Sequence, residues 1–348
     1  TLKYYKKGTY KVTVTASIGG TIVSDSCTII VNNTSPWRIF NAMYNETRPS
    51  CVVVDKKGTI YFSHLYTGGG SGDNPGRSAS TTLSNPKFEG APSFGPKTWQ
   101  ILLDDESEKN YFLTGEGVSI YKGSNITIYN TSTSAIPSNT VKRGVLDADG
   151  RLWLGTPSGL ASLENYTITA YDNANTNSVL GKETITALTV DARNRVWIGT
   201  PTGLVMKDGN TWTRYTPDNS GLPAPYIFGI VEDNNGAMWM GAGNFGKHGD
   251  SGFNDCPESM VGLVRFDGVL WTQFNSTNSP LASNYVNSLT IDKKGNLWVG
   301  TASYFLGSKA GVIAGCGLLK YDGTNWTTFN TSNSLLPDND VQWVGTDR

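Results

Sequence analysis

Charged residues, histidine and long hydrophobic runs are all scarce in this chain of 348 residues. Only 16% of the residues are charged, and 28 Lys and Arg nearly balance 29 Asp and Glu. A surface with so balanced a charge lacks the basic footprint that binds nucleic acids and anionic lipids. No apolar run approaches the ~20 residues that a membrane-spanning helix needs. The sequence therefore predicts no nucleic-acid partner and no membrane span in this chain.

Catalytic and metal-binding motifs are missing as well. The four cysteines form no C-x-x-C pair, which argues against zinc and redox sites of that type. There is no G-x-S-x-G motif, no Ser-His-Asp order and no phosphate-binding glycine loop. The sequence thus predicts no catalytic residue, no bound metal and no cofactor.

Glycine and aromatic residues are abundant instead, with 40 Gly, 10 Trp and 16 Tyr, and they recur in one motif. The motif begins with an Asp, continues through a turn that usually contains Gly, and places a Trp or Tyr six residues after the Asp. Its copies lie at residues 55–63, 105–118 (a decayed copy), 147–160, 191–204, 233–243 and 292–302. The aromatic anchors of these copies are Tyr61, Tyr111, Trp153, Trp197, Trp239 and Trp298. A strand-rich repeat of about 42 residues is typical of the four-stranded blades of a β-propeller.

Each repeat divides into four predicted strands. An apolar strand A, such as residues 185–191, ends at the Asp and would lie nearest the axis. Strand B carries the aromatic anchor, strand C starts with Gly-Leu as in residues 317–323, and strand D follows the pattern W-T-x-[YF]. We expect the anchors to fill the space between neighbouring sheets, and the Gly two residues later to allow close approach. The Asp should accept hydrogen bonds from the turn.

The repeat resembles the two component regulator propeller repeat, and the resemblance covers roughly residues 37–348. It implies a β-propeller, often seven-bladed, that lies outside the cytoplasm, as in periplasmic modules that sense oligosaccharides. Residues 1–33 resemble the last strands of a PKD-type immunoglobulin-like domain, and a plain β-hairpin is the alternative. The residues that carry this second resemblance are Tyr5, Gly8, Tyr10, Val12, Val14, Gly20 and 28–31. We therefore expect a PKD/Ig-like segment at 1–33 and a propeller at 34–348.

The number of strands predicts an incomplete last blade. Strand A occurs seven times, the last time at 341–347, whereas strand B occurs six times. Residues 36–41 resemble an isolated strand D. The predicted fold is an all-β propeller of seven blades whose last blade takes strand D from 36–41 and strand A from 341–347. The missing strands would follow in a longer chain or come from another chain, and a six-bladed ring is the alternative.

The loop end of the predicted propeller is the expected working surface. The insertions at 64–98, 242–260 and 302–316 all follow strand B, so they emerge on the same face as the D–A loops. The stretch 64–98 must also hold irregular strands C and D of the first blade. Residues just before each strand A would surround the axis on that face, and their Tyr, Asn and Arg side chains suit a glycan or protein ligand. The candidate ligand-binding residues are Arg48, Asn139, Glu183, Tyr226, Asn284, Tyr285, Asp340 and, from an insertion, His248; Lys97 occupies the equivalent place before its own strand A. Ordinary loop residues are the alternative interpretation.

Histidine chemistry and calcium binding are weaker hypotheses. His64 and His248 both fall on the insertion face, where they could support acid–base chemistry. Streptogramin lyase, another propeller, is vaguely similar, but its repeats lack the W-x-G-T-x-x-G-L form found here. The D-x-x-G turns lack the spacing of an EF-hand, so we interpret their Asp residues as turn caps.

The cysteines predict one disulfide. Cys256 and Cys316 each fall late in the B–C insertion of neighbouring blades, and we expect them to pair. Cys27 with Cys51 is a weaker suggestion. A disulfide would imply an oxidising compartment outside the cytoplasm.

The predicted function is that of a non-catalytic binding or assembly module of a larger secreted or cell-surface protein. Its partner would be a protein or a glycan at the loop face, with self-assembly through the incomplete blade or the N-terminal strands as a further route. The alternatives are a carbohydrate-sensing module of periplasmic type, and a lyase or hydrolase that uses His248 or His64.

Overall fold

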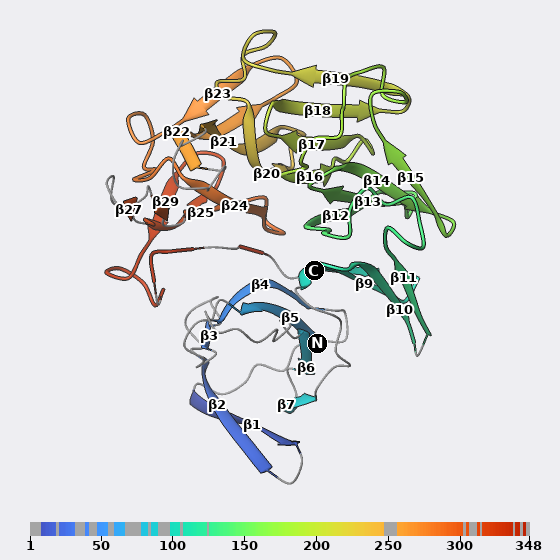
Figure 1. Cartoon of the computed structure of the whole chain (residues 1–348). Coiled ribbons are helices and arrows are strands. Elements are labelled where there is room, and N and C mark those ends of the chain that lie inside the picture. The colour runs from blue at the N-terminus through green and yellow to red at the C-terminus, as the bar shows by residue number, and fades with distance from the viewer. Residues whose placement is uncertain are drawn as a thin grey trace.

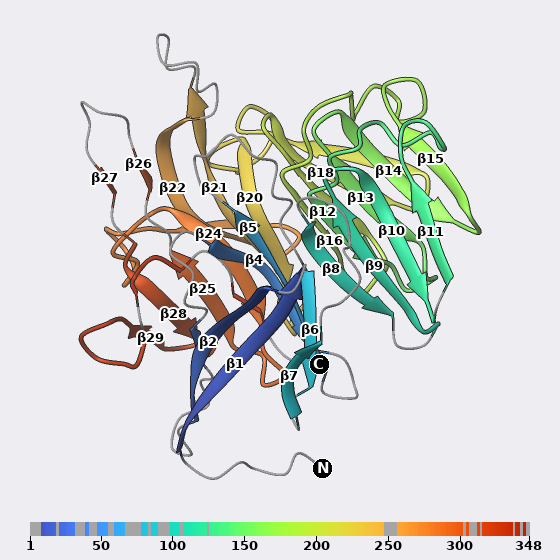
Figure 2. The same ribbon diagram turned by 60° about the horizontal axis from the view of Figure 1, so that its bottom comes forward.

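The computed structural model consists of β-strands and their connections, and the part of the chain that it describes contains no helix. It describes residues 8–18, 21–31, 39–41, 47–54, 59–66, 78–82, 85–89, 98–104, 107–123, 125–246, 256–301, 304–305, 312–313, 315–336, 338–341 and 344–345. The chain is an all-β propeller, as predicted. In Figure 1 the sheets follow one another around a common centre, and Figure 2 shows the same sheets from another side.

Among the described residues, six sheets each contain four antiparallel strands, and we number them as blades 1 to 6. Blade 1 contains β4 (Thr47–Val54), β5 (Thr59–Tyr66), β6 (Ser78–Thr82) and β7 (Asn85–Glu89). Blade 2 contains β8 (Thr98–Asp104), β9 (Lys109–Thr114), β10 (Gly117–Lys122) and β11 (Asn125–Tyr129). Blade 3 contains β12 (Arg143–Leu146), β13 (Leu152–Thr156), β14 (Gly159–Glu164) and β15 (Thr167–Tyr171).

The later blades have the same order of strands. Blade 4 contains β16 (Ala187–Val190), β17 (Val196–Thr200), β18 (Gly203–Asp208) and β19 (Thr211–Tyr215). Blade 5 contains β20 (Tyr226–Glu232), β21 (Met238–Gly246), β22 (Cys256–Phe266) and β23 (Trp271–Phe274). Blade 6 contains β24 (Val286–Ile291), β25 (Leu297–Thr301), β28 (Gly317–Tyr321) and β29 (Trp326–Phe329). The predicted strands A to D of the repeat are thereby confirmed in the last four blades.

Burial changes from the inner strand of a blade to the outer one. The B strands β13 and β17 are buried at every position, whereas the A strand β16 is buried only at Ala187 and half-buried beyond it. The D strand β15 buries one residue of five. The core therefore lies in the middle strands of each sheet and between the faces of neighbouring sheets.

The aromatic anchors fill the space between sheets, as the sequence predicts. Trp153 packs in one cluster with Val196 and Ile198 of the next blade, and Trp197 packs in the same way with Met238 and Met240. Both indoles are 1% exposed. Burial of a large apolar side chain stabilises a fold by about 1.5–3 kcal/mol, so each repeat ties its own sheet to the following one.

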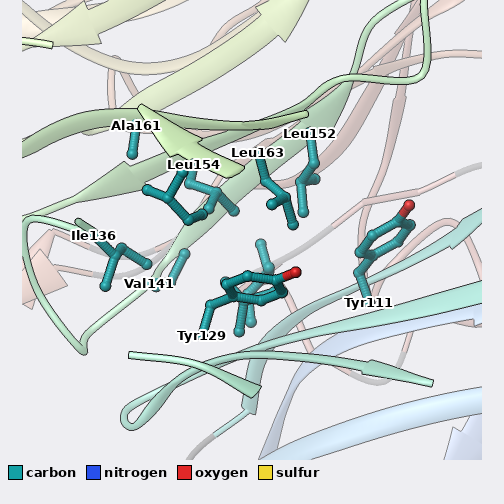
Figure 3. Close-up of a cluster of buried hydrophobic side chains, with 11 residues drawn as sticks. Tyr111, Tyr129, Ile136, Val141, Leu152, Leu154, Ala161 and Leu163 are labelled. Atoms are coloured by element: carbon teal, nitrogen blue, oxygen red, sulfur yellow. The ribbon is translucent and has the colours of Figure 1, made fainter. Parts of the chain in front are cut away.

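Blade 2, which carries the decayed repeat, is joined to blade 3 by aliphatic and tyrosine side chains. Figure 3 shows Tyr111 and Tyr129 from blade 2 facing Leu152 and Leu154 of β13. The turn of this repeat is described only in part. Asp104 accepts the hydrogen bonds of Ser107, whereas the Asp105 that the motif would use lies outside the described residues.

The motif Asp is both a turn cap and the partner of the indole. In blade 3, Asp147 Oδ1 accepts from the backbone N–H groups of Asp149 and Arg151, and its Oδ2 accepts from Trp153 Nε1 at 2.9 Å. The same indole bond measures 2.7, 2.8 and 2.9 Å at Trp197, Trp239 and Trp298, in that order. The carboxylate thus satisfies a buried donor that would otherwise be costly.

The motif Gly allows the next strand A to approach closely. A Cβ on Gly155 would lie 2.7 Å from Ile185, and a Cβ on Gly199 would lie 2.9 Å from Ile227. Both partners stand at the start of the following blade. Packing between blades therefore excludes even a methyl group at this position.

The segment after blade 6 occupies the place of a further strand A. Val341 N–H donates to the carbonyl of Thr301, as Val141 and Ile185 donate to Thr114 and Thr156 of the preceding blades. Val344 N–H donates to Ser288 Oγ at 2.9 Å.

The prediction of a strand at 341–347 is nevertheless not met at the described positions 341, 344 and 345, which are not in a strand. The physical reason is that a strand A needs a strand B beside it, and the described residues place none there.

The N-terminal strands form a sheet of their own, in which β1 (Gly8–Ile18) pairs with β2 (Thr21–Val31) and β2 with β3 (Ile39–Asn41). The predicted isolated strand D at 36–41 is therefore wrong in one respect, because its described part pairs with β2. This pairing also crosses the predicted boundary between residues 33 and 34. The PKD-like character of this segment, the domain boundary and the number of blades stay predictions.

Candidate functional site

The loops between strand D and the next strand A share one end of the propeller with the B–C connections. This follows from the antiparallel order, because strands B and D run in the same direction within a blade. Two of the predicted insertions contain regular structure at that end, where β21 and β22 continue as a ribbon and β26 (Tyr304–Phe305) pairs with β27 (Val312–Ile313). Both project together in Figure 2. We call this the loop end, and the A–B turns mark the turn end.

The D–A loops are braced by their own side chains. In blade 5, Asn278 accepts from the N–H of Asn275 at 2.8 Å and donates to the carbonyl of Gln273 at 2.9 Å. Asn175, Asn219 and Asn333 make the same pair of bonds in blades 3, 4 and 6. Such local side-chain bonds replace the missing ladder partners of a loop. The D–A loops of blades 3 to 6 are therefore held in place by their own side chains.

Two of the predicted ligand-binding residues belong to this bracing. Asn139 accepts from the N–H of Thr131 at 2.7 Å, and Asn284 accepts from the N–H of Ser276 at 2.8 Å. Glu183 is likewise engaged, because it pairs with Arg214 and accepts from Thr202. These contacts give Asn139, Asn284 and Glu183 a structural role in the loops. Their predicted role in ligand binding stays a prediction.

Two other predicted residues, Tyr226 and Tyr285, lie in an aromatic arc at the axial edge of the loop end. The rings of Tyr226 and Phe228 are 4.7 Å apart between centroids, and those of Phe228 and Tyr285 are 5.8 Å apart in an edge-on arrangement. All three side chains are half-buried. Burial raises the pKa of Tyr285, and the nearby charge of Asp340 raises it further.

Arg143 extends the arc on the side of blade 3. Its side chain reaches solvent, yet the neighbouring blades crowd it enough that desolvation lowers its pKa, while the charge of Tyr226 acts in the opposite direction. Arg143 Nε donates to the carbonyl of Thr186 at 3.0 Å. We define the axial arc as Arg143, Tyr226, Phe228, Tyr285 and Asp340.

Side chains around the axis bridge several of the described A strands to the next blade, as Arg143 does to Thr186. Gln100 both accepts from and donates to the backbone of Gly144, and Thr186 Oγ1 donates to the carbonyl of Ile227 at 2.5 Å. Ser288 makes the corresponding contact with Val344. These bridges satisfy backbone groups at the inner edges of the sheets.

Several predicted site residues fall outside the described part of the chain. Arg48 and His64 lie in β4 and β5, whose side chains are not described, and Lys97 and His248 lie outside the described residues altogether. Cys316 is a thiol whose pKa is raised by burial, but the side chain of Cys256 is not described. The disulfide therefore stays a prediction.

A second feature of the loop end is an open pocket of about 380 Å³ that is lined by Asp172, Asn173, Ala174 and Lys182. It lies in the D–A loop of blade 3, where Asn177 and Ser178 both have a positive φ.

No group of three or more His, Cys, Asp or Glu residues is arranged for a metal ion within the described ranges. No helix that could cross a membrane is found among them either.

Sequence reasoning missed Arg143 and Phe228. Both stand in strand A rather than before it, so the search for loop residues passed over them. The two adjacent basic residues Lys142 and Arg143, just before the apolar positions that lead to the motif Asp147, were the available signal for Arg143. The ring contacts of Phe228 depend on a bulge in β20 between Ile227 and Gly229, which the sequence did not indicate.

Comparison with known proteins identifies the repeat. Residues 221–244 and 280–303 match the model of the two component regulator propeller family. Each match runs from a D–A loop through strand A into strand B, in blades 5 and 6. None of the curated proteins compared with the chain matches it.

Solved structures with the same architecture come from three settings. PorZ, a surface component of the type-IX secretion system of Porphyromonas gingivalis, has a TM-score of 0.58 and 14% identity, over 92% of this chain and 47% of that one. The extracellular domain of the putative hybrid two component system BT4673 of B. thetaiotaomicron has a TM-score of 0.54 and 19% identity, over 86% and 37%. Virginiamycin B lyase of Staphylococcus aureus has a TM-score of 0.58 and 14% identity, over 83% and 86%. This chain thus spans less than half of the first two proteins, and such identities establish the propeller fold alone.

Proposed function

Because the chain carries two component regulator propeller repeats, we propose that it is a non-catalytic binding module of an extracellular, cell-surface or periplasmic protein. Its ligand, a glycan or a protein, would be taken up at the loop end. The proposed location is supported by the extracellular domain and the surface component among its structural neighbours.

The axial arc is the observation that carries this proposal. It brings three half-buried aromatic rings and two charged side chains to one edge of a surface whose loops are already braced. Preformed sites with aromatic walls and a few polar groups are typical of ligand binding. Repeat packing does not account for the rings, since the blade-to-blade space is filled by the Trp anchors.

A catalytic role has less support. The likeness to virginiamycin B lyase concerns the fold alone. The side chains of His64 and His248 are not among those that the structure describes. The described residues also contain no group of three or more His, Cys, Asp or Glu side chains that could hold a metal ion. We therefore keep the lyase hypothesis as an alternative that activity measurements on His248→Ala and His64→Ala would address.

The test is a glycan array followed by titration of the best probe with two variants. Tyr226→Ala and Tyr285→Ala should each weaken binding by about tenfold or more, because an aromatic contact in a desolvated site contributes 1.4 kcal/mol or more. Tyr166→Ala is the matched control, since Tyr166 is 76% exposed in the turn between β14 and β15, at the turn end. Binding that survives both arc substitutions would contradict the proposed site.

Assembly through the last blade is a second candidate function, and Trp298 favours it. The three other Trp anchors are 1–2% exposed, whereas Trp298 is only half-buried. Each buried anchor packs against the following blade, and the described residues place only the segment at 341 and 344 beyond blade 6. A partially covered sheet face beside an unpaired strand position is suited to strand addition from a partner.

A further inference from the structure

We propose that Arg143 binds the carboxylate of an acidic sugar at one end of the axial arc. The inference rests on the proposed function, because the sugar would lie in the same arc, and it adds the charge and chemical class of the ligand. The geometry, charge and register of Arg143 and the bridged strand edges around it carry the inference.

One hydrogen bond orients the guanidinium of Arg143, and most of its N–H donors remain available to a ligand. Its Nε donates to the carbonyl of Thr186 at 3.0 Å, and its Nη1 makes a long 3.5 Å contact with the carbonyl of Lys142. A guanidinium has five N–H donors, and Nη1 with Nη2 can bind both oxygens of a carboxylate end-on. The bond through Nε fixes the plane of the group and leaves this pair of nitrogens for a ligand.

Four of the other described arginines form ion pairs, whereas Arg143 and the exposed Arg193 at the turn end do not. Ion pairs join Arg151 to Glu164, Arg195 to Asp191, Arg214 to Glu183, and Arg265 to Asp233 and Asp267. In the part of the chain that the structure describes, Arg143 has no carboxylate partner, although it is crowded by neighbouring blades. Because Arg143 reaches solvent and has no counter-charge, an anionic ligand can approach it and form a charge-assisted hydrogen bond.

Packing does not require an arginine at this position. Arg143 is paired with the motif glycine Gly155, and the residues paired with the motif glycines of blades 4, 5 and 6 are Ala187, Gly229 and Ser288. The repeat therefore accepts small residues here. In blade 2 the equivalent residue is Gln100, which bridges to Gly144 as Arg143 bridges to Thr186. A bridge of this kind explains a long polar side chain at the position, but it does not require the positive charge of Arg143.

The arc also has a direction. Tyr226 is near enough to Arg143 to influence its pKa, whereas Asp340 influences the pKa of Tyr285 at the other end of the arc. An acidic sugar would place its carboxylate at Arg143 and its hydroxyl groups toward Asp340. The rings between these ends offer apolar surface to the sugar rings.

A sugar fits this place better than a peptide does. One common mode of peptide binding adds a strand to a free sheet edge. At the axial end of the A strands, side chains already bridge the backbone, as in Gln100 to Gly144 and Thr186 to Ile227. The arc thus presents side-chain groups rather than a strand edge.

The test uses the whole chain and three probes: tri-galacturonic acid, the same trimer with its carboxyl groups reduced to alcohols, and tri-glutamate. By titration calorimetry the acidic sugar should bind about tenfold tighter than the reduced one, as expected for a charge-assisted hydrogen bond. The difference should shrink as salt is added, because exposed charges are screened.

Three variants assign this difference to Arg143. Arg143→Gln should bind the acidic and reduced sugars equally, and Arg143→Lys should keep part of the preference, since an ammonium lacks the planar pair of donors. Arg193→Gln is the matched control, because Arg193 is exposed at the turn end, and it should keep the full preference. An unchanged thermal midpoint shows that each variant is folded.

The outcomes separate this inference from the proposed function. Equal binding of both sugars by the unaltered protein, with both lost in Tyr285→Ala, overturns the inference and leaves the binding module intact. Binding of tri-glutamate in preference to the sugars overturns the assignment to a sugar. If other glycans bind at the arc but none of these probes does, the acidic-sugar inference fails and the proposed binding function stands. If nothing binds at the arc, the proposed function is contradicted as well.

Discussion

Blades 4 and 6 carry nearly the same motif but have different surroundings. In both, an Asp accepts the indole N–H of its Trp, at 2.7 Å for Trp197 and 2.9 Å for Trp298, and caps the same turn. Blade 5 covers Trp197, which is 1% exposed, whereas Trp298 is half-buried beside the segment that includes Val341 and Val344.

The comparison separates what a repeat does by itself from what its neighbour adds. The turn, its backbone capping bonds and the pairing of the anchor with a Thr of strand A are shared by both blades, although strand A of blade 6 has a bulge between Val286 and Ser288. The burial of the anchor also differs, and burial supplies most of the stabilisation from a large side chain. Substitutions at equivalent positions should therefore have different costs in the two blades.

The largest difference is expected at the anchors. Trp197→Ala should lower the free energy of unfolding by about 3–5 kcal/mol, as for a fully buried aromatic residue, and Trp298→Ala by roughly half as much. Denaturant unfolding of both variants measures this. Equal costs at low protein concentration would mean that another segment of the chain already covers Trp298.

The same pair of variants bears on assembly. If copies of the protein cover Trp298, the unfolding midpoint of the unaltered chain should rise with protein concentration, and Trp298→Ala should remove that dependence. A midpoint that is independent of concentration in both proteins argues against self-assembly through this face.

A smaller difference is expected at the motif glycines. A Cβ on Gly199 would meet Ile227 at 2.9 Å within a packed interface, so Gly199→Ala should cost about 1–3 kcal/mol. Gly300→Ala would meet Val344 at 2.8 Å, but the segment around Val344 has only blade 6 beside it among the described residues and can shift. Gly229→Ala is the control, because its nearest neighbour would lie at 4.0 Å, and it should leave stability unchanged.

The smallest expected effect is on the pH dependence of stability, through Asp292 in the turn that both blades share. Burial acts to raise the pKa of Asp292, but hydrogen bonds from Asn296, Trp298 and Lys294 outweigh it and lower that pKa. A lowered pKa in the folded state adds stability above the unfolded value of about 4, and this stability is lost as the pH falls through the folded value. Asp292→Asn should therefore be less stable at neutral pH and lose less stability below pH 4. Parallel stability curves for the two proteins would contradict this.

The sequence determined the repeat and almost everything local to it. Aromatic anchors at a fixed distance from an Asp sufficed to place strands A to D in the last four blades, and the four Asp residues of those blades make the capping bonds expected of them. These features depend on contacts within about six residues, which a linear pattern can specify.

Tertiary structure decided which residues share the loop end. Asn139 and Glu183 looked like ligand-binding residues because of their position before strand A, but their partners Thr131 and Arg214 come from turns and strands that the pattern does not relate. The axial arc joins Arg143 to Tyr226 and Tyr285 across four blades. Such proximity follows from closure of the sheets around an axis, because contacts between blades depend on how whole sheets pack and not on the residues beside each one in the chain.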